Sequence, residues 1–362
     1  MTEALLSIRG LVTEFSTPDG VVHAVDGVSY DVHPGETVGV VGESGSGKSV
    51  TVMSILRLIP QPPGRIAAGE ILLEGRNLLE LNDAELRKVR GREIAMIFQD
   101  PMTSLNPVLT VGAQLAEAIQ THDKQVSDAE ARRRVVELLE LVGVPNAAAR
   151  FGQYPHEYSG GMRQRAMIAM AIANRPKILI ADEPTTALDV TIQAQVLQVL
   201  KTAQEETAAG TILITHDLGV IAEMADRVVV MYGGKVVETG TVDDIFHNPS
   251  HPYTLGLLSS LPRAGQQMER LEPIPGQPPS LINLPGGCSF HPRCRISKGR
   301  DRCRTEVPDL VQLADGRASA CHFHEELPEE IARISAATGV DIEQDHHGAH
   351  EPVAQRDERE DD

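Results

Sequence analysis

The chain has 362 residues, and its 33 basic and 51 acidic side chains give a formal net charge of −18. This balance argues against a nucleic-acid or anionic-lipid surface, because such surfaces gather Lys and Arg. No stretch approaches the roughly 18 apolar residues of a membrane span, and the opening MTEALLSIRG lacks the pattern of an export signal. We therefore expect the chain to work in the cytoplasm, as a large α/β domain with an appendage.

The first predicted elements are strands followed by a loop and a helix. Residues 4–40 alternate or run apolar around a turn at TPDG, which predicts an antiparallel sheet. The apolar run TVGVV then leads into GESGSGKS, and SVTVMSILRLI follows as a helix that we expect to end at Pro60. The middle segment has the G-x-x-x-x-G-K-S spacing of a phosphate-binding loop, the P-loop.

The residue types of this loop suit a phosphate. Gly45 and Gly47 let backbone N–H groups point inward around an oxyanion, and the following helix N-terminus adds positive potential. Lys48 supplies a charge for the β- and γ-phosphates, and the Ser49 hydroxyl is placed for Mg²⁺. A glycine-rich turn that binds nothing is the alternative, and the flanking strand and helix argue against it.

The middle of the chain reads as helical. NDAE at Asn82–Glu85 and SDAE at Ser127–Glu130 both have capping-box spacing. The second precedes ARRRVVELLELVG, a predicted helix that ends at Gly143. We expect mostly helix over about 103–173.

A buried strand with two terminal carboxylates follows. In ILIADE, Ile178–Ala181 forms the predicted strand, and Asp182 and Glu183 stand at its carboxyl end, where ligands collect in α/β sheets. Asp182 would reach Mg²⁺, and Glu183 would polarise the water that attacks the γ-phosphate. A glutamine-rich helix over about 190–208, the strand TILIT and the hairpin RVVVMYGGKVVET complete this domain near residue 245.

Further segments complete a family pattern. YSGGMRQR spans Tyr158–Arg165, FQD spans Phe98–Asp100, ALD spans Ala187–Asp189, and His216 follows TILIT. With the P-loop and ILIADE, these segments have the order of ABC ATPases, which the chain resembles. The resemblance implies an α/β fold: a P-loop ABC ATPase with a mixed sheet core, an antiparallel β subdomain and an inserted helical subdomain.

The resemblance also implies roles for single residues. Ser159, Gly160 and Gly161 of one cassette would contact ATP on the P-loop of another, in a head-to-tail dimer. Ser159 opens the predicted helix GMRQRAMIAMAIAN, so the phosphate would meet a helix N-terminus there. Met162 stands where the family often has Gln, but the serine and glycines do the phosphate work. The implied catalytic residues are Lys48, Gln99, Glu183 and His216. The implied nucleotide contacts are Phe15 on adenine, Gly42, Ser44, Gly45, Gly47, Lys48, Ser49, Val50, Gln99, Asp182, Ser159, Gly160 and Gly161, and the implied Mg²⁺ ligands are Ser49, Gln99 and Asp182.

Beyond the nucleotide domain the chain becomes proline-rich and carries its four cysteines. They are Cys288, Cys294, Cys303 and Cys321, spaced C-x5-C-x8-C-x17-C. A reducing cytosol disfavours structural disulfides, which leaves a metal site or plain thiols. The spacing lacks the C-x2-C knuckle typical of zinc. HPYTLGLLSSLP and GCSFHPRC resemble the C-terminal extension of oligopeptide and dipeptide importer ATPases, where such cysteines imply a 4Fe–4S cluster, with zinc or free or paired thiols as alternatives.

These observations divide the chain into three parts. We expect a nucleotide domain over 1–250, a Cys-containing extension over 251–325, and an acidic tail over 326–362 that is disordered by composition. The tail contains HHGAH, which could hold a metal ion, but the composition of the tail favours a solvated segment.

The family resemblance then implies a function. We expect the ATPase subunit of a peptide importer, at the cytoplasmic face of the cell membrane. Its partners would be a second ATPase, a paralogue in preference to an identical chain, two transmembrane permease subunits and an extracytoplasmic substrate-binding protein. Nickel chelates or haem are alternative cargoes, and a soluble ABC ATPase outside transport is the alternative class.

Overall fold

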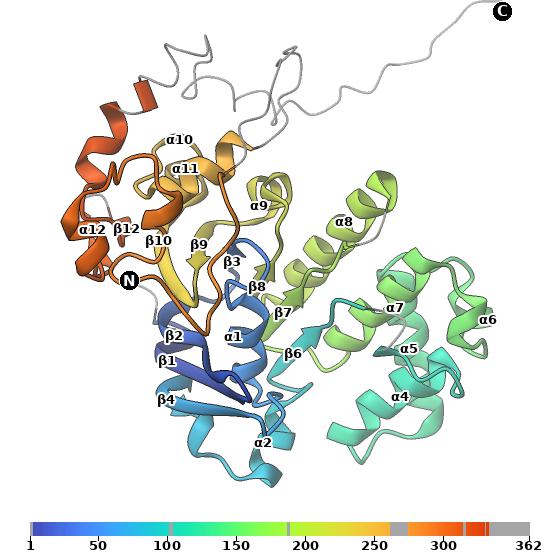
Figure 1. The fold of residues 1–362 in the computed structure, drawn as a ribbon. Helices are drawn as coiled ribbons and strands as arrows, with labels where there is room; N and C mark the ends of the chain where they lie inside the picture. The colour runs from blue at the N-terminus through green and yellow to red at the C-terminus, as the bar shows by residue number, and fades with distance from the viewer. Residues whose placement is uncertain are drawn as a thin grey trace, which may run out of the picture.

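The computed structural model describes residues 3–100, 104–186, 189–260, 274–313, 316–329 and 331–332. Two sheets form its centre (Figure 1). The smaller has the strand order β2-β1-β4-β5 and is antiparallel, as predicted for the N-terminal region. Its strands are β1 (Leu6–Thr17), β2 (Gly20–Val32), β4 (Gly64–Leu73) and β5 (Arg76–Asn77).

The larger sheet is mixed and has the order β11-β12-β10-β9-β3-β8-β7-β6. Strands β9, β3, β8, β7 and β6 run parallel, and β10, β12 and β11 add antiparallel pairs. Their bounds are β3 (Thr37–Val41), β6 (Ile94–Ile97), β7 (Ile178–Asp182), β8 (Gly210–Ile214), β9 (Arg227–Tyr232), β10 (Lys235–Thr241), β11 (Val311–Gln312) and β12 (Ala318–Ser319). The extension therefore contributes two short strands to the nucleotide-domain sheet.

The central strands are buried on both faces, which explains their unbroken apolar sequences. In β3, every residue of TVGVV is buried. Alternate residues enter two cores: Val38 and Val40 face the antiparallel sheet, and Val41 faces a core built with helices. The strands that lead into the loops of this sheet therefore lie between two packed layers.

Helices cover this sheet or gather beyond it. Around the sheet lie α1 (Lys48–Ile55), α2 (Asp83–Val89), α8 (Val190–Thr207), α9 (Leu218–Met224), α10 (Val242–His247), α11 (Pro252–Ser259) and α12 (Asp301–Thr305). Four helices lie together beyond β6 (Figure 1): α4 (Val111–His122), α5 (Asp128–Leu141), α6 (Ala147–Arg150) and α7 (Gly160–Ile172). These four occupy the stretch for which the sequence predicts helix. Short 3-10 turns are η1 (Leu78–Glu80), η2 (Pro155–Glu157), η3 (His291–Arg293) and η4 (His324–Glu326).

The capping predictions hold in part. Asn82 and Glu85 form a reciprocal capping box at α2, as predicted. At α5, Ser127 accepts from the Glu130 N–H as the cap, but the reciprocal bond is not among the contacts of this helix start. The N-terminus of α5 is thus closed by one side chain.

The prediction for the end of α1 is wrong by about five residues. The helix stops at Ile55, where Arg57 adopts φ 49° and the Leu58 N–H donates to the Met53 carbonyl at 2.8 Å. This left-handed closure is a Schellman motif, and it ends the helix before Pro60 is reached.

The extension also ends later than composition predicts. Leu327 and Ile331 are buried against Leu255 and Ile296, so packed structure continues past the predicted boundary of 325. Residues 333–362, with the HHGAH segment, lie outside the described residues. In the described part of the chain, no helix is both long and apolar enough to cross a bilayer.

Gly112 offers a test of packing in the helical region. A Cβ there would lie 2.4 Å from the Phe151 ring and 2.5 Å from its carbonyl oxygen. Alanine gains about 1 kcal/mol of helix propensity, but the overlap costs about 1–3 kcal/mol, so we expect Gly112→Ala to lower stability in urea unfolding. Gly152→Ala is the control, because its Cβ meets nothing within 4 Å. Equal stability of both variants would contradict the packing argument.

Candidate functional site

The P-loop joins β3 to α1 as predicted, and close backbone contacts hold it in place. Gly42 lies so near β9 that a Cβ would come 2.2 Å from the Met231 carbonyl oxygen. Gly47 has φ 103°, and a Cβ there would come 2.4 Å from the Ala24 carbonyl oxygen of β2. Glycine is therefore required at both positions. The Gly234 N–H of the β9–β10 turn also donates to the Ser46 carbonyl at 3.1 Å.

Lys48 is buried within this loop. Its Nζ donates to the carbonyls of Gly42 at 2.6 Å and Glu43 at 3.1 Å. Burial lowers the pKa of Lys48, and the carboxylates of Glu183, Asp182 and Glu43 oppose that shift. The buried Ser46 hydroxyl has no hydrogen-bond partner among the described residues. The loop thus offers an ammonium, an unused hydroxyl and the N-terminus of α1, which together suit a phosphate.

A hydroxyl and a carboxylate adjoin the loop. Ser49 Oγ donates to Asp182 Oδ1 at 3.0 Å, which joins α1 to the carboxyl end of β7. Burial raises the pKa of Asp182, and the Ser49 hydrogen bond opposes it. Oxygen donors of this kind suit Mg²⁺. Val50 is half-buried, and its side chain packs on the core.

Glu183 contacts two other residues that the sequence predicts to be catalytic, Gln99 and His216. Its Oε2 accepts from Gln99 Nε2 at 3.0 Å, and its Oε1 lies 3.6 Å from His216 Nδ1. Thr186, which sequence reasoning missed, donates its hydroxyl to Glu183 Oε2 at 2.8 Å. Glu183 itself has φ 48°, a conformation that costs a non-glycine residue about 1–3 kcal/mol and that clusters at functional sites. The strand end therefore places this carboxylate between two polar side chains from other elements.

The YSGG segment is not part of this cluster. Ser159 caps α7, as predicted, by accepting from the Met162 N–H at 3.3 Å. Helix α7 packs against β6 and α8, away from the P-loop strand β3 in the sheet order. Ser159 and Gly160 are exposed, and Gly161 is half-buried, so this helix N-terminus is open to another molecule.

Two other predicted segments have different surroundings. Phe15 is half-buried on β1, and its ring lies 2.9 Å from the position of a Cβ on Gly64 of β4. The ring therefore covers a strand glycine, and its stacking on adenine stays a prediction. Ala187 and the residue after it lie outside the described residues, and Asp189 caps α8 by accepting from the Ile192 N–H at 3.0 Å.

The four cysteines share one small cavity of the extension. Cys288, Cys294, Cys303 and Cys321 are free thiols and line it together with Phe290, Ile296 and Phe323. Burial raises the pKa of Cys288 to about 11 and that of Cys321 to about 12, although backbone N–H groups oppose both shifts. No three His, Cys, Asp or Glu side chains of the described residues surround a point where one metal ion would fit. The four thiols thus line the same cavity, but they are not arranged around one point as ligands of a single metal ion are.

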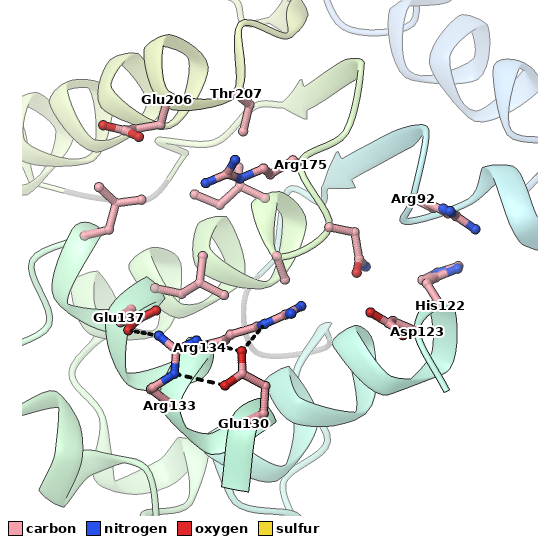
Figure 2. Close-up of a pocket in the computed structure, with 15 residues that line it drawn as sticks. Arg92, His122, Asp123, Glu130, Arg133, Arg134, Glu137, Arg175, Glu206 and Thr207 are labelled. Atoms are coloured by element: carbon pink, nitrogen blue, oxygen red, sulfur yellow. Dashed lines mark hydrogen bonds and ion pairs between the residues drawn. The ribbon is translucent and has the colours of Figure 1, made fainter. Parts of the chain in front are cut away.

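A large cavity lies elsewhere. It measures about 890 Å³ and lies between α4, α5 and Arg175 (Figure 2). Its Glu130 pairs with Arg133 at 2.7 Å and with Arg134 at 2.8 Å. None of the predicted catalytic, nucleotide-binding or cysteine residues lines it. This cavity is therefore separate from the predicted nucleotide site.

A P-loop beside a carboxylate-tipped strand, an added antiparallel sheet and an inserted helical region whose last helix begins at an SGG segment together indicate the class of ABC ATPases. A family model described as ABC transporter matches residues 25–186, and one described as oligopeptide/dipeptide transporter, C-terminal region, matches residues 237–303. The chain belongs to the oligopeptide/dipeptide family of ABC transporter ATP-binding proteins.

Similar proteins share most of their length with this chain. The oligopeptide transport ATP-binding protein OppD of Bacillus subtilis is 56% identical over 312 residues, 86% of each chain. The dipeptide transport ATP-binding protein DppD of Escherichia coli is 51% identical over 320 residues, 88% of this chain and 97% of the relative. A solved dimeric post-hydrolysis structure of the ATP-binding cassette MJ0796 with ADP and Pi is 28% identical, with a TM-score of 0.59 over 66% of this chain and 98% of the other.

Proposed function

We propose that the chain is the ATP-hydrolysing subunit that powers uptake of di- or oligopeptides through a membrane permease. The observation that carries the catalytic part is the contact of Glu183 with both Gln99 and His216, beside the Lys48 ammonium and the Ser49–Asp182 pair. The names of the relatives, which specify oligopeptide and dipeptide transport, support peptides over nickel chelates or haem as cargo.

The chemistry follows from these positions. The P-loop N–H groups and Lys48 bind the β- and γ-phosphates, with Gly42, Ser44, Gly45 and Gly47 forming the cradle. Glu183 holds and polarises the attacking water, and Gln99 and His216 orient that carboxylate through their contacts with it. Ser49, Asp182 and Gln99 would hold Mg²⁺, which neutralises phosphate charge when bound.

A second cassette completes the site. The α7 N-terminus at Ser159, Gly160 and Gly161 packs with β6 and α8 and not with the P-loop strand of its own chain, and helix N-termini attract anions. The similar cassette MJ0796 is dimeric in its structure with ADP and Pi, which supports a dimer of cassettes. We favour a paralogue as the partner, with an identical chain as the alternative.

An apolar surface supports docking on the permease. Phe98 precedes Gln99 and is 43% exposed, while Val108 and Leu109 are 75% and 40% exposed. Phe98 and Leu109 line a cavity of about 530 Å³ with Met96 and Met167. Apolar grooves of this kind receive partner segments. This surface would link Gln99 to two permease subunits at the cytoplasmic face of the membrane, which an extracytoplasmic binding protein supplies with cargo.

The cysteine cavity is proposed to hold a 4Fe–4S cluster. Four thiols meet in one place, and the Phe323 N–H lies 3.5 Å from Cys321 Sγ, as suits a sulfur that carries negative charge. A single zinc ion needs ligands around one point at about 2.3 Å, and no three described ligand side chains are so arranged. We favour the cluster, which four cysteine thiolates ligate, and keep zinc and free or paired thiols as alternatives.

Glu183→Gln tests the catalytic proposal. We expect hydrolysis to fall about 100-fold or more while ATP binding persists, because the amide cannot polarise the water. Phosphate release and size-exclusion chromatography with ATP, on the chain with its partner cassette, measure both effects and should reveal a trapped pair. Glu205→Gln, an exposed glutamate of α8, is the matched control. Wild-type hydrolysis in Glu183→Gln would overturn the assignment.

Iron and acid-labile sulfide analysis of anaerobically purified protein tests the cluster. We expect iron and sulfide in equal amounts, and a strong loss of both in Cys294→Ser, because each thiolate ligates one iron. Arg302→Ala, an exposed residue of the same extension, should keep the wild-type content. Protein that carries zinc and no iron would refute the cluster.

A further inference from the structure

An ion pair joins the extension to the P-loop. Arg293 donates from Nη1 to Glu43 Oε2 at 2.6 Å and from Nη2 to Glu43 Oε1 at 2.9 Å. Glu43 is the second residue of GESGSGKS, and Arg293 belongs to the turn η3 between Cys288 and Cys294. Two parallel bonds of this kind fix geometry as well as charge.

The surroundings of Arg293 make this pair a rigid one. Its side chain is only 6% exposed, and its Nε donates to the Pro275 carbonyl at 2.9 Å. Nη1 also lies 3.3 Å from the Tyr232 hydroxyl of β9. Loss of one partner from a buried, hydrogen-bonded pair leaves an uncompensated charge, which is costly.

The backbone of Glu43 is held from the same side. Its N–H donates to the Tyr253 hydroxyl of α11 at 2.7 Å, and its carbonyl accepts from Lys48 Nζ at 3.1 Å. The Tyr253 ring lies 4.6 Å from that of Tyr232 and 5.4 Å from that of Phe290, between ring centroids. The extension therefore makes hydrogen bonds to both the side chain and the main chain of Glu43. The carbonyl of Glu43 in turn accepts a hydrogen bond from Lys48.

The turn that carries Arg293 is built from the cysteine segment. The Cys288 N–H donates to the Cys303 carbonyl at 2.9 Å, and the His291 N–H donates to the Cys288 carbonyl at 3.0 Å. The Arg293 N–H closes the turn on the Phe290 carbonyl at 3.0 Å. The position of the guanidinium thus depends on the fold around the cysteines.

We propose that Arg293 is a positioning residue for the P-loop, and that through Glu43 it makes nucleotide affinity depend on the integrity of the four-cysteine region. The inference rests on the proposed function, in which this loop binds ATP. Arg293 neutralises a carboxylate that would otherwise repel the triphosphate, and it fixes the loop residue whose carbonyl holds Lys48. Disturbance at the cysteines would reach the phosphates along these contacts.

Titration of the full-length chain with a fluorescent ATP analogue and Mg²⁺ tests the ion pair. We expect Arg293→Ala to weaken binding about tenfold, the scale of one charge-assisted contact, and Arg293→Lys to weaken it less. Because the freed carboxylate causes much of the loss, adding Glu43→Gln to Arg293→Ala should restore part of the affinity. Wild-type affinity in Arg293→Ala, or a double variant that shows the sum of both single losses, would overturn the proposal.

Two controls separate this inference from its basis. Arg302→Ala removes an exposed arginine of the same extension and should leave affinity unchanged. Lys48→Ala should abolish binding. If Lys48→Ala still binds, the proposed nucleotide site fails; if it does not bind but Arg293→Ala binds normally, only the positioning role fails.

A final comparison tests the link to the cysteines. Cys294→Ser should weaken nucleotide binding in the wild-type background but add little in the Arg293→Ala background, because the connecting contact is already gone. Circular dichroism of each variant monitors the fold of the nucleotide domain. Equal losses from Cys294→Ser in both backgrounds, or no loss in the wild type, would contradict the coupling.

Discussion

The close approach of the P-loop to its neighbours is the constraint on which the site depends. Gly42 touches the β9 backbone, Gly47 touches β2, and the β9–β10 turn bonds to Ser46. A loop held on three sides keeps its N–H groups in place before a phosphate arrives, so binding costs little reorganisation. The same fixed loop lets Lys48, Ser49 and the β7 carboxylates meet at one end of the sheet.

Local patterns predicted much of this arrangement. The P-loop, the carboxylates after β7, the Ser159 and Asn82 caps and the Gly-Gly hairpin each arise from residues near one another in sequence. Contacts between distant segments left no such signal. Glu43 and Arg293 are 250 positions apart in the sequence. The pairing of β12 with β10 was also not predicted, because β12 is too short to show a pattern of alternating apolar and polar residues. The end of α1 was missed because a non-glycine residue, Arg57, takes the left-handed conformation there.

In the proposed function, the chain contributes two separate halves of a shared site. One half is the P-loop with Glu183, and the other is the N-terminus of α7, which packs elsewhere in the chain. Because α7 packs on β6 and α8, its position relative to the P-loop of a partner depends on how the helical region is seated on the sheet.

The pairing of β12 with β10 has a consequence for how the chain tolerates shortening. Glu238 and Thr239 of β10 pair with Ser319 and Ala318, so the extension caps the outermost long strand of the main sheet. Truncation of the protein after the nucleotide domain would leave these backbone N–H and carbonyl groups of β10 unpaired. Exposed strand edges of this kind promote aggregation. The C-terminal region thus covers part of a strand edge that would otherwise be open to other chains.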